Sequence, residues 1–113
     1  MDIDERTVDG VTILDLKGQM TLGAGDALLK DKINSLIQQE RNRIILNLGQ
    51  VTYIDSASLG VIVGGFTTVT NRGGKLVLLN LTTRIEDLLS ITKLLTVFET
   101  FDSEAEALKA AAA

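Results

Sequence analysis

The sequence predicts one α/β domain over residues 1–113, with a mixed sheet of four to five strands, an N-terminal hairpin and about four helices. Three observations support this fold class. Short β-branched, apolar runs alternate with longer stretches of helical periodicity. Asp9-Gly10 separates two strand-like segments near the start of the chain. A length of 113 residues, without repeat or linker, is typical of a single domain.

The first elements form a hairpin followed by a glycine-rich loop. Residues 7–8 and 11–16 flank Asp9-Gly10, a two-residue signal for a type I′ turn. Residues 18–25 then read as a loop whose glycines lack the spacing of a nucleotide-binding fingerprint. We therefore expect two antiparallel strands and an irregular connection to the first helix.

Two strand–helix pairs follow this loop. From about residue 26, apolar residues recur at helical spacing, and residues 44–48 form a near-continuous apolar strand. A second helix is predicted from about 56 to 71, and its internal glycines indicate a close approach to the sheet. The apolar positions of the two helices are Leu29, Ile33, Leu36, Ile37, Leu59, Ile62, Val63, Phe66 and Val69.

The last third of the chain continues the alternation. Residues 75–79 predict a buried strand after a glycine stop, and residues 83–86 form a capping box that opens a short helix with Ile85, Leu88, Leu89 and Ile91 inward. Residues 96–98 are a short strand candidate. A second capping box at 103–106 begins a C-terminal helix. The later strands are expected to be parallel and joined by helical crossovers.

Composition excludes several classes of function. Without cysteine or histidine, the chain can form no disulfide, no thiolate metal site and no Ser-His-Asp triad. A net charge of -4 and an aromatic content of 4% argue against nucleic-acid binding. No apolar run approaches a membrane span, and the acidic N-terminus is unlike a signal peptide. We expect a cytoplasmic protein that is not an enzyme, binds no metal or cofactor, and does not insert into membranes.

The junction at Asp55-Ser56 is the main candidate site. A β-branched run ends there and a long helical pattern begins, so Ser56 is placed where a helix N-terminus accommodates an anion. Taken alone, a small polar residue there is most often a helix cap. Asp55 is the better cap, which leaves the Ser56 hydroxyl free in the first turn. Ser58 is a second hydroxyl nearby, on a different sector of the helix.

Residues 55–60, Asp-Ser-Ala-Ser-Leu-Gly, resemble the Asp-Ser-Ser-Gly-Leu-Gly signature of STAS domains, the anti-sigma factor antagonists of bacterial partner-switching systems. Ser58 departs from the signature, because it stands where the family has glycine. The resemblance covers nearly the full chain, in the family's order: the hairpin, 16–20, 44–48, 53–54, 72–76 and 79–81.

This resemblance implies a phosphorylation switch. Ser56 would be the phospho-acceptor, Asp55 its supporting carboxylate, and Ser58 either an obstacle to the kinase or a second acceptor. The implied partners are an anti-sigma factor serine kinase of histidine-kinase-like fold and a metal-dependent serine phosphatase. Without the phosphate, the protein would bind the kinase. The predicted partner-binding residues are Gly23, Ala24, Gly25, Asp26, Ala57, Leu59 and Gly60.

Alternatives remain open for both the loop and the function. The loop at 23–26 is also explained, without any partner, as a plain connection before a helix capped by Asp26. The same family resemblance is compatible with a scaffold subunit of a large signalling assembly or of a lipid-transport ATPase complex. The switch predicts a free monomer or weak dimer, whereas the scaffold predicts a large particle or a co-purifying membrane ATPase.

Overall fold

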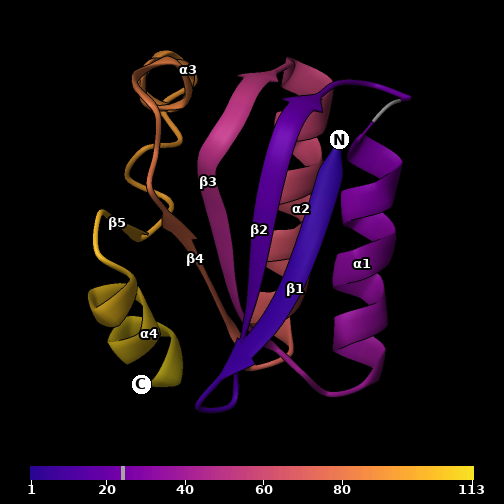
Figure 1. Ribbon diagram of the computed structural model, residues 1–113, viewed down its shortest axis with the longest axis vertical. Helices are drawn as coiled ribbons and strands as arrows, with labels where there is room; N and C mark the ends of the chain where they lie inside the picture. Colours follow the sequence, from indigo (N-terminus) through magenta and orange to yellow (C-terminus); the bar gives the residue numbers. More distant parts are fainter. Residues whose placement is uncertain (24) are drawn as a thin grey trace.

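The computed structural model describes residues 1–23 and 25–113, which form nine elements around one sheet (Figure 1). In chain order these are β1 (Asp2–Val8), β2 (Val11–Met20), α1 (Asp26–Gln38), β3 (Arg43–Ile54), α2 (Ser56–Asn71), β4 (Lys75–Leu79), α3 (Thr83–Ile91), β5 (Thr100–Phe101) and α4 (Glu104–Ala112). The predicted fold class is confirmed, with a mixed sheet and an N-terminal hairpin.

The strands lie in the sheet in their sequence order, β1-β2-β3-β4-β5. β1 is antiparallel to β2, and every later pair is parallel, as predicted. The hairpin turn has φ angles of 51° at Asp9 and 81° at Gly10, the positive values that a type I′ turn requires. Aspartate tolerates this conformation and glycine favours it, which explains the turn.

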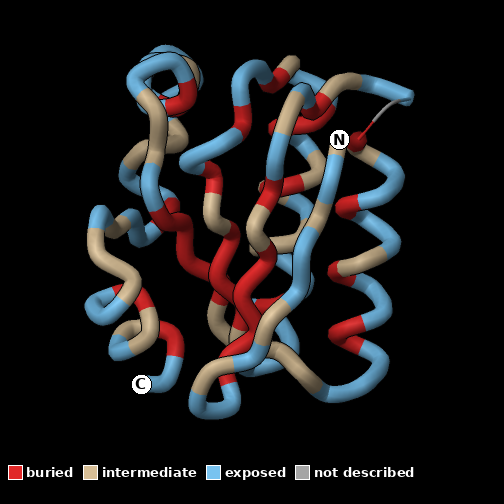
Figure 2. The backbone as a smooth tube through the Cα atoms, viewed as in Figure 1, coloured by how far each residue is buried: buried red, intermediate tan, exposed pale blue. Residues whose placement is uncertain are grey.

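Helices cover both faces of the sheet, and each face has its own apolar core (Figure 2). The larger core joins one face of the sheet to α1, α2 and α3, and contains fully buried residues such as Leu14, Leu46 and Ile62. The smaller core joins the other face to α4 through Ala107 and Ala111. Continuous burial on both faces accounts for the uninterrupted apolar runs of β3 and β4.

The central strands are longer than predicted, and their length positions the candidate site. β2 continues to Met20 and β3 to Ile54, and these two residues are partners in the parallel ladder. The predicted loop at 18–25 is therefore shorter, because its first residues belong to β2. Since both strands end side by side, the β2–α1 loop lies beside the start of α2 (Figure 1).

Several local predictions were wrong. Residues 96–98 form no strand, and the short edge strand is Thr100–Phe101 instead. The cap of α3 is Thr82 rather than Thr83, since the Thr82 side chain accepts the backbone N–H of Ile85. Ile91, predicted inward, is 80% exposed because α3 ends there. The C-terminal capping residue Ser103 is confirmed.

The glycines of α2 serve a different contact from the predicted one. A Cβ on Gly65 would lie 2.8 Å from the Cδ1 atom of Ile33, so this glycine allows α2 to approach α1 rather than the sheet. Gly60 and Gly64 face open space. A substitution at these two positions therefore meets no steric obstacle in the described part of the chain.

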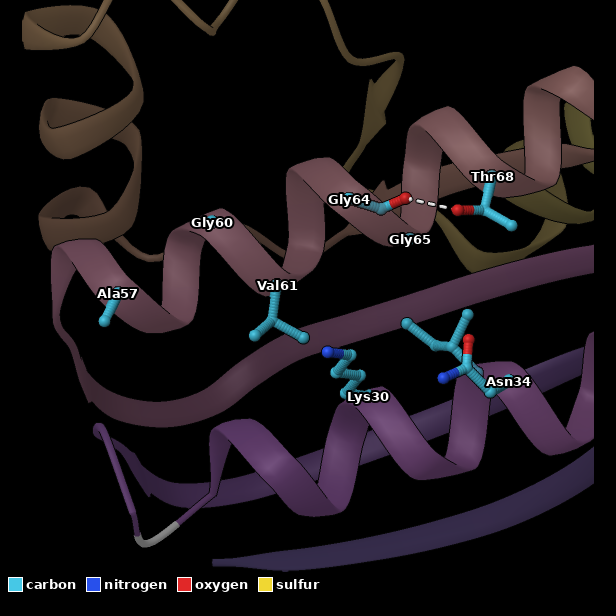
Figure 3. A pocket seen from close by; sticks show the side chains of 9 residues that line it. Lys30, Asn34, Ala57, Gly60, Val61, Gly64, Gly65 and Thr68 are labelled. Carbon is cyan, nitrogen blue, oxygen red and sulfur yellow. Dashed lines mark hydrogen bonds between the residues drawn. The ribbon is translucent and has the colours of Figure 1, made fainter.

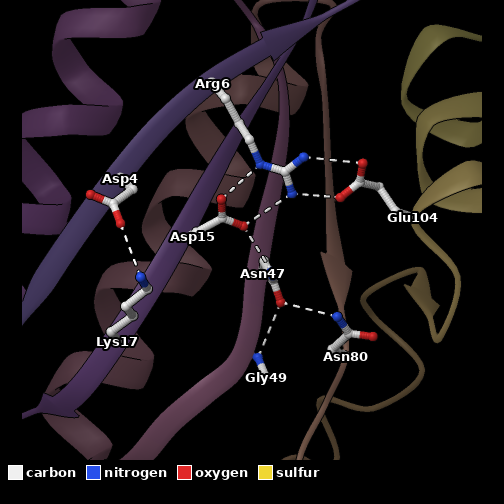
Figure 4. Close-up of polar contacts among 8 residues, drawn as sticks. All are labelled: Asp4, Arg6, Asp15, Lys17, Asn47, Gly49, Asn80 and Glu104. Carbon is white, nitrogen blue, oxygen red and sulfur yellow. Dashed lines mark hydrogen bonds and ion pairs between the residues drawn. The ribbon is translucent and has the colours of Figure 1, made fainter.

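A polar network fastens α4 to the hairpin (Figure 4). The Arg6 guanidinium donates to both oxygens of Asp15, at 2.7 and 3.2 Å, and to both oxygens of Glu104. Asp15 also accepts the amide of Asn47 at 2.8 Å. The Arg6 guanidinium holds the pKa of the Glu104 carboxyl below its usual value. It also lowers the pKa of the Asp15 carboxyl, and the Asn47 amide lowers that pKa further. This network ties the two ends of the chain together.

Candidate functional site

Asp55 joins α2 to the β2–α1 loop. Its Oδ1 atom accepts the backbone N–H of Ser58 at 2.8 Å, which makes it the cap of α2 as predicted. Its Oδ2 atom accepts the backbone N–H of Leu22 at 2.9 Å. These two N–H groups, that of Leu22 first, lower the pKa of the Asp55 carboxyl, because both favour its charged form. One carboxylate therefore holds both segments.

Ser56 is the first residue of α2, and its side chain is exposed. The backbone N–H groups of Ser56 and Ala57 have no hydrogen-bond partner among the described residues, as expected in the first turn of a helix. Together with the helix dipole, these donors favour an anion at this position. The geometry thus presents a free hydroxyl beside a small anion-binding turn.

Ser58 occupies a different environment from Ser56. It is fully buried, and its hydroxyl has no hydrogen-bond partner within the described chain. The hydroxyl lies close enough to Asp55 to help lower the pKa of that carboxyl, although the two side chains do not meet the geometry of a hydrogen bond. A kinase acting on the folded domain cannot reach a fully buried oxygen. The folded structure therefore leaves Ser56 as the accessible hydroxyl of the pair.

The β2–α1 loop lies at the same end of the sheet as Ser56, because Met20 at the end of β2 pairs with Ile54 at the end of β3. The Gly23 N–H donates to the Asp26 carboxylate at 2.8 Å, so Asp26 stabilises the loop. The predicted capping role of Asp26 is wrong: the N-cap of α1 is Gly25, and Asp26 is the first helical residue. Gly23 is exposed, whereas Gly25 is buried against Met1. Ala24 lies outside the described residues.

The predicted partner-binding residues on α2 are not all accessible to a partner. Ala57 and Gly60 are exposed on the helix surface. Leu59 is only 5% exposed and packs in the larger core. Its side chain is therefore unavailable to a partner, because the helical spacing that places Ala57 and Gly60 outward turns Leu59 toward the sheet.

A groove of about 300 Å³ runs between α1 and α2 from Ala57 toward Thr68 (Figure 3). Lys30 extends from α1 toward α2, and Gly60 and Gly64 leave the opposite wall low. Its lining residues are Lys30, Ile33, Asn34, Ala57, Gly60, Val61, Gly64, Gly65 and Thr68. The groove extends the exposed surface around Ser56 along the helix pair.

Sequence reasoning missed Leu22. This side chain is 71% exposed in the β2–α1 loop, while its backbone N–H is held by Asp55. The available signal was a single leucine between Thr21 and Gly23, in a segment that otherwise contains small and polar residues. Only the pairing of β2 with β3 places this leucine next to the Ser56 turn.

Neither a metal centre nor a membrane span is found in the described chain. Among residues 1–23 and 25–113, the aspartate and glutamate side chains form no group of three or more that could hold a metal ion. Within the same residues, no helix is long and apolar enough to cross a membrane.

Comparison with known proteins finds matches that cover most of the chain. The family model described as the STAS domain matches residues 2–107. An anti-sigma-B factor antagonist of Listeria monocytogenes is 33% identical over 110 residues, covering 94% of this chain and 91% of that protein. A putative anti-sigma factor antagonist of Thermotoga neapolitana is 33% identical over 104 residues, covering 92% of each chain. A crystal structure of a putative anti-sigma factor antagonist from Thermotoga maritima has a TM-score of 0.90 at 28% identity, covering 98% of this chain and 95% of that one.

Proposed function

Because this chain belongs to the STAS domain family, we propose that it is an anti-sigma factor antagonist controlled by phosphorylation of Ser56. Without phosphate, it binds an anti-sigma factor that is also a serine kinase of histidine-kinase-like fold. A metal-dependent serine phosphatase restores the binding form. The protein acts in the cytoplasm, as a regulatory binding module rather than an enzyme.

The observation that carries this proposal is the contrast between Ser56 and Ser58. Ser56 is exposed at the first turn of α2, whereas Ser58 is fully buried. Folded protein therefore presents a kinase with one hydroxyl at this turn. The unpaired first-turn N–H groups favour negative charge beside Ser56, so we expect the fold to tolerate a phosphate there.

The same charge opposes binding of a partner. Phosphate adds about 1.5 to 2 negative charges and three strongly solvated oxygens. A partner that packs over Ser56 must desolvate this group, and the adjacent carboxylate of Asp55 increases the local negative potential. The modification thus releases the partner while the domain keeps its structure.

Phosphorylation and binding assays with purified proteins test this function. The chain is incubated with ATP and the anti-sigma factor kinase of its own genome, and the site is mapped by mass spectrometry. We expect one phosphate on Ser56, none on Ser56→Ala, and normal phosphorylation of the matched control Ser58→Ala. Binding of Ser56→Asp to the kinase should be at least tenfold weaker, with a melting temperature close to that of the parent. If Ser56→Asp binds as tightly as the parent, charge at Ser56 does not control the partner.

A further inference from the structure

The exposed side chain of Leu22 is the feature that the proposed function leaves unexplained. A single exposed leucine is ordinary on a protein surface, so exposure alone carries no conclusion. Leu22 differs because its backbone is held in place while its side chain is left in solvent. The Leu22 N–H donates to Asp55 at 2.9 Å, and the next N–H, that of Gly23, donates to Asp26 at 2.8 Å. Two carboxylates therefore fix the loop that presents a 71% exposed leucine.

The position of this leucine connects it to the proposed switch. Asp55 holds Leu22 through one oxygen and caps α2 through the other, and Ser56 is the next residue. The loop projects at the end of the sheet where α2 begins and is largely exposed (Figures 1 and 2). A second exposed apolar side chain, Leu28, is 47% exposed in the first turn of α1, beside the same loop. Two exposed apolar side chains thus lie in or next to the loop that Asp55 ties to the phosphorylatable turn.

We propose that Leu22 is the apolar anchor by which this protein docks on its anti-sigma factor, and that Asp55 is the positioning residue that presents it. This inference rests on the proposed function and names the chemistry of the partner surface. That surface is an apolar socket for Leu22 beside the kinase site that meets Ser56.

The anchor also explains how one phosphate releases a whole protein surface. Apolar residues that dominate an interface do so when neighbouring contacts exclude water from them. A phosphate on Ser56 keeps its own hydration next to Leu22, because Ser56 and Leu22 share Asp55 as their neighbour. Water then remains at the edge of the socket, so the contact between Leu22 and the partner is no longer shielded from solvent and binding weakens.

Binding to the anti-sigma factor kinase that recognises the parent chain tests the anchor. We expect Leu22→Ala to weaken binding at least tenfold and Leu22→Met, which preserves apolar volume, to bind within about threefold of the parent. The matched control is Ile91→Ala, since Ile91 is 80% exposed at the end of α3, which lies well apart from the loop in Figure 1. The control should bind as the parent does. All three variants should melt with the parent, because these side chains are exposed.

A second measurement tests the positioning role of Asp55. Asp55→Asn removes one of the two carboxylate acceptors, so we expect faster hydrogen exchange at the Leu22 amide in the free protein. In a double-mutant cycle, Asp55→Asn should weaken binding less in the Leu22→Ala background than in the parent. Additive effects, or an unchanged Leu22 amide, would overturn the positioning role.

The outcomes separate this inference from the proposed function. If the parent binds no anti-sigma factor, the proposed function fails and the anchor fails with it. If the parent binds and Leu22→Ala binds equally well, the anchor is refuted while the phosphorylation switch stands. If Leu22→Ala and Ile91→Ala weaken binding alike, the loss reflects general surface hydrophobicity and the anchor is again refuted.

Discussion

The buried hydroxyl of Ser58 predicts that its removal stabilises the protein. Ser58 is fully buried, and its oxygen has no partner in the described chain. A buried hydroxyl without a hydrogen bond costs about 1–3 kcal/mol. Alanine removes this cost, loses few contacts, and is a somewhat better helix former. We therefore expect Ser58→Ala to raise the free energy of unfolding by about 1–2 kcal/mol.

The expected change is large enough to measure by thermal unfolding. A chain of 113 residues has an unfolding entropy of about 0.24 kcal/mol/K, from about 2.1 cal/mol/K per residue. A gain of about 1–2 kcal/mol then raises the melting temperature by about 4–8 °C. Urea unfolding followed by circular dichroism should show a higher midpoint at unchanged slope.

Two controls distinguish the hydroxyl from other effects of substitution. Ser56→Ala removes an exposed hydroxyl from the same turn and should change the free energy of unfolding by less than about 0.5 kcal/mol. Ser58→Gly should be nearly neutral, because glycine's helix penalty of about 1 kcal/mol offsets the gain. If Ser58→Ala is less stable than the parent by 1 kcal/mol or more, the hydroxyl has a partner in solution and the reasoning is refuted.

Glycine substitutions and acid titration provide further tests. Gly64→Ala should raise the free energy of unfolding by about 1 kcal/mol, since Gly64 is a helical glycine facing open space. Gly74→Ala should lower the free energy of unfolding by more than about 1 kcal/mol, because its Cβ would overlap the backbone oxygen of Asn42. If Gly64→Ala and Gly74→Ala changed the urea unfolding midpoint alike, this packing would be contradicted. Glu104→Gln should lower the free energy of unfolding by less than about 1 kcal/mol at pH 7, because the side chains of the Arg6–Glu104 ion pair are about 40% exposed. The folded-state pKa of Glu104 is lowered, so its contribution is present above the ordinary value of 4.5 and disappears as the pH falls below it. The free energies of unfolding of the parent and Glu104→Gln should therefore become equal in acid. If the difference between them did not change with pH, the ion pair would not be its cause.

Much of the fold and part of the site could be predicted from sequence because their signals are local. Apolar periodicity identified the helices and the buried strands, and Asp9-Gly10 identified the hairpin turn. A strand pattern ends and a helix pattern begins at Asp55-Ser56, and this change predicted both the cap of α2 and the exposed hydroxyl of Ser56. Each of these depends on neighbours within a few residues along the chain.

Tertiary structure decided what depends on segments distant in the sequence. Leu22 and Asp55 are 33 residues apart, and only the parallel pairing of β2 with β3 brings the loop to the carboxylate. Packing of α2 against the sheet buries Ser58, which its place in the motif did not reveal. Gly65 likewise received its role from Ile33 on α1. The local sequence therefore determined that hydroxyl groups lie at the start of a helix. Long-range packing determined that the Ser56 hydroxyl is accessible, that the Ser58 hydroxyl is not, and that the Leu22 side chain lies nearby.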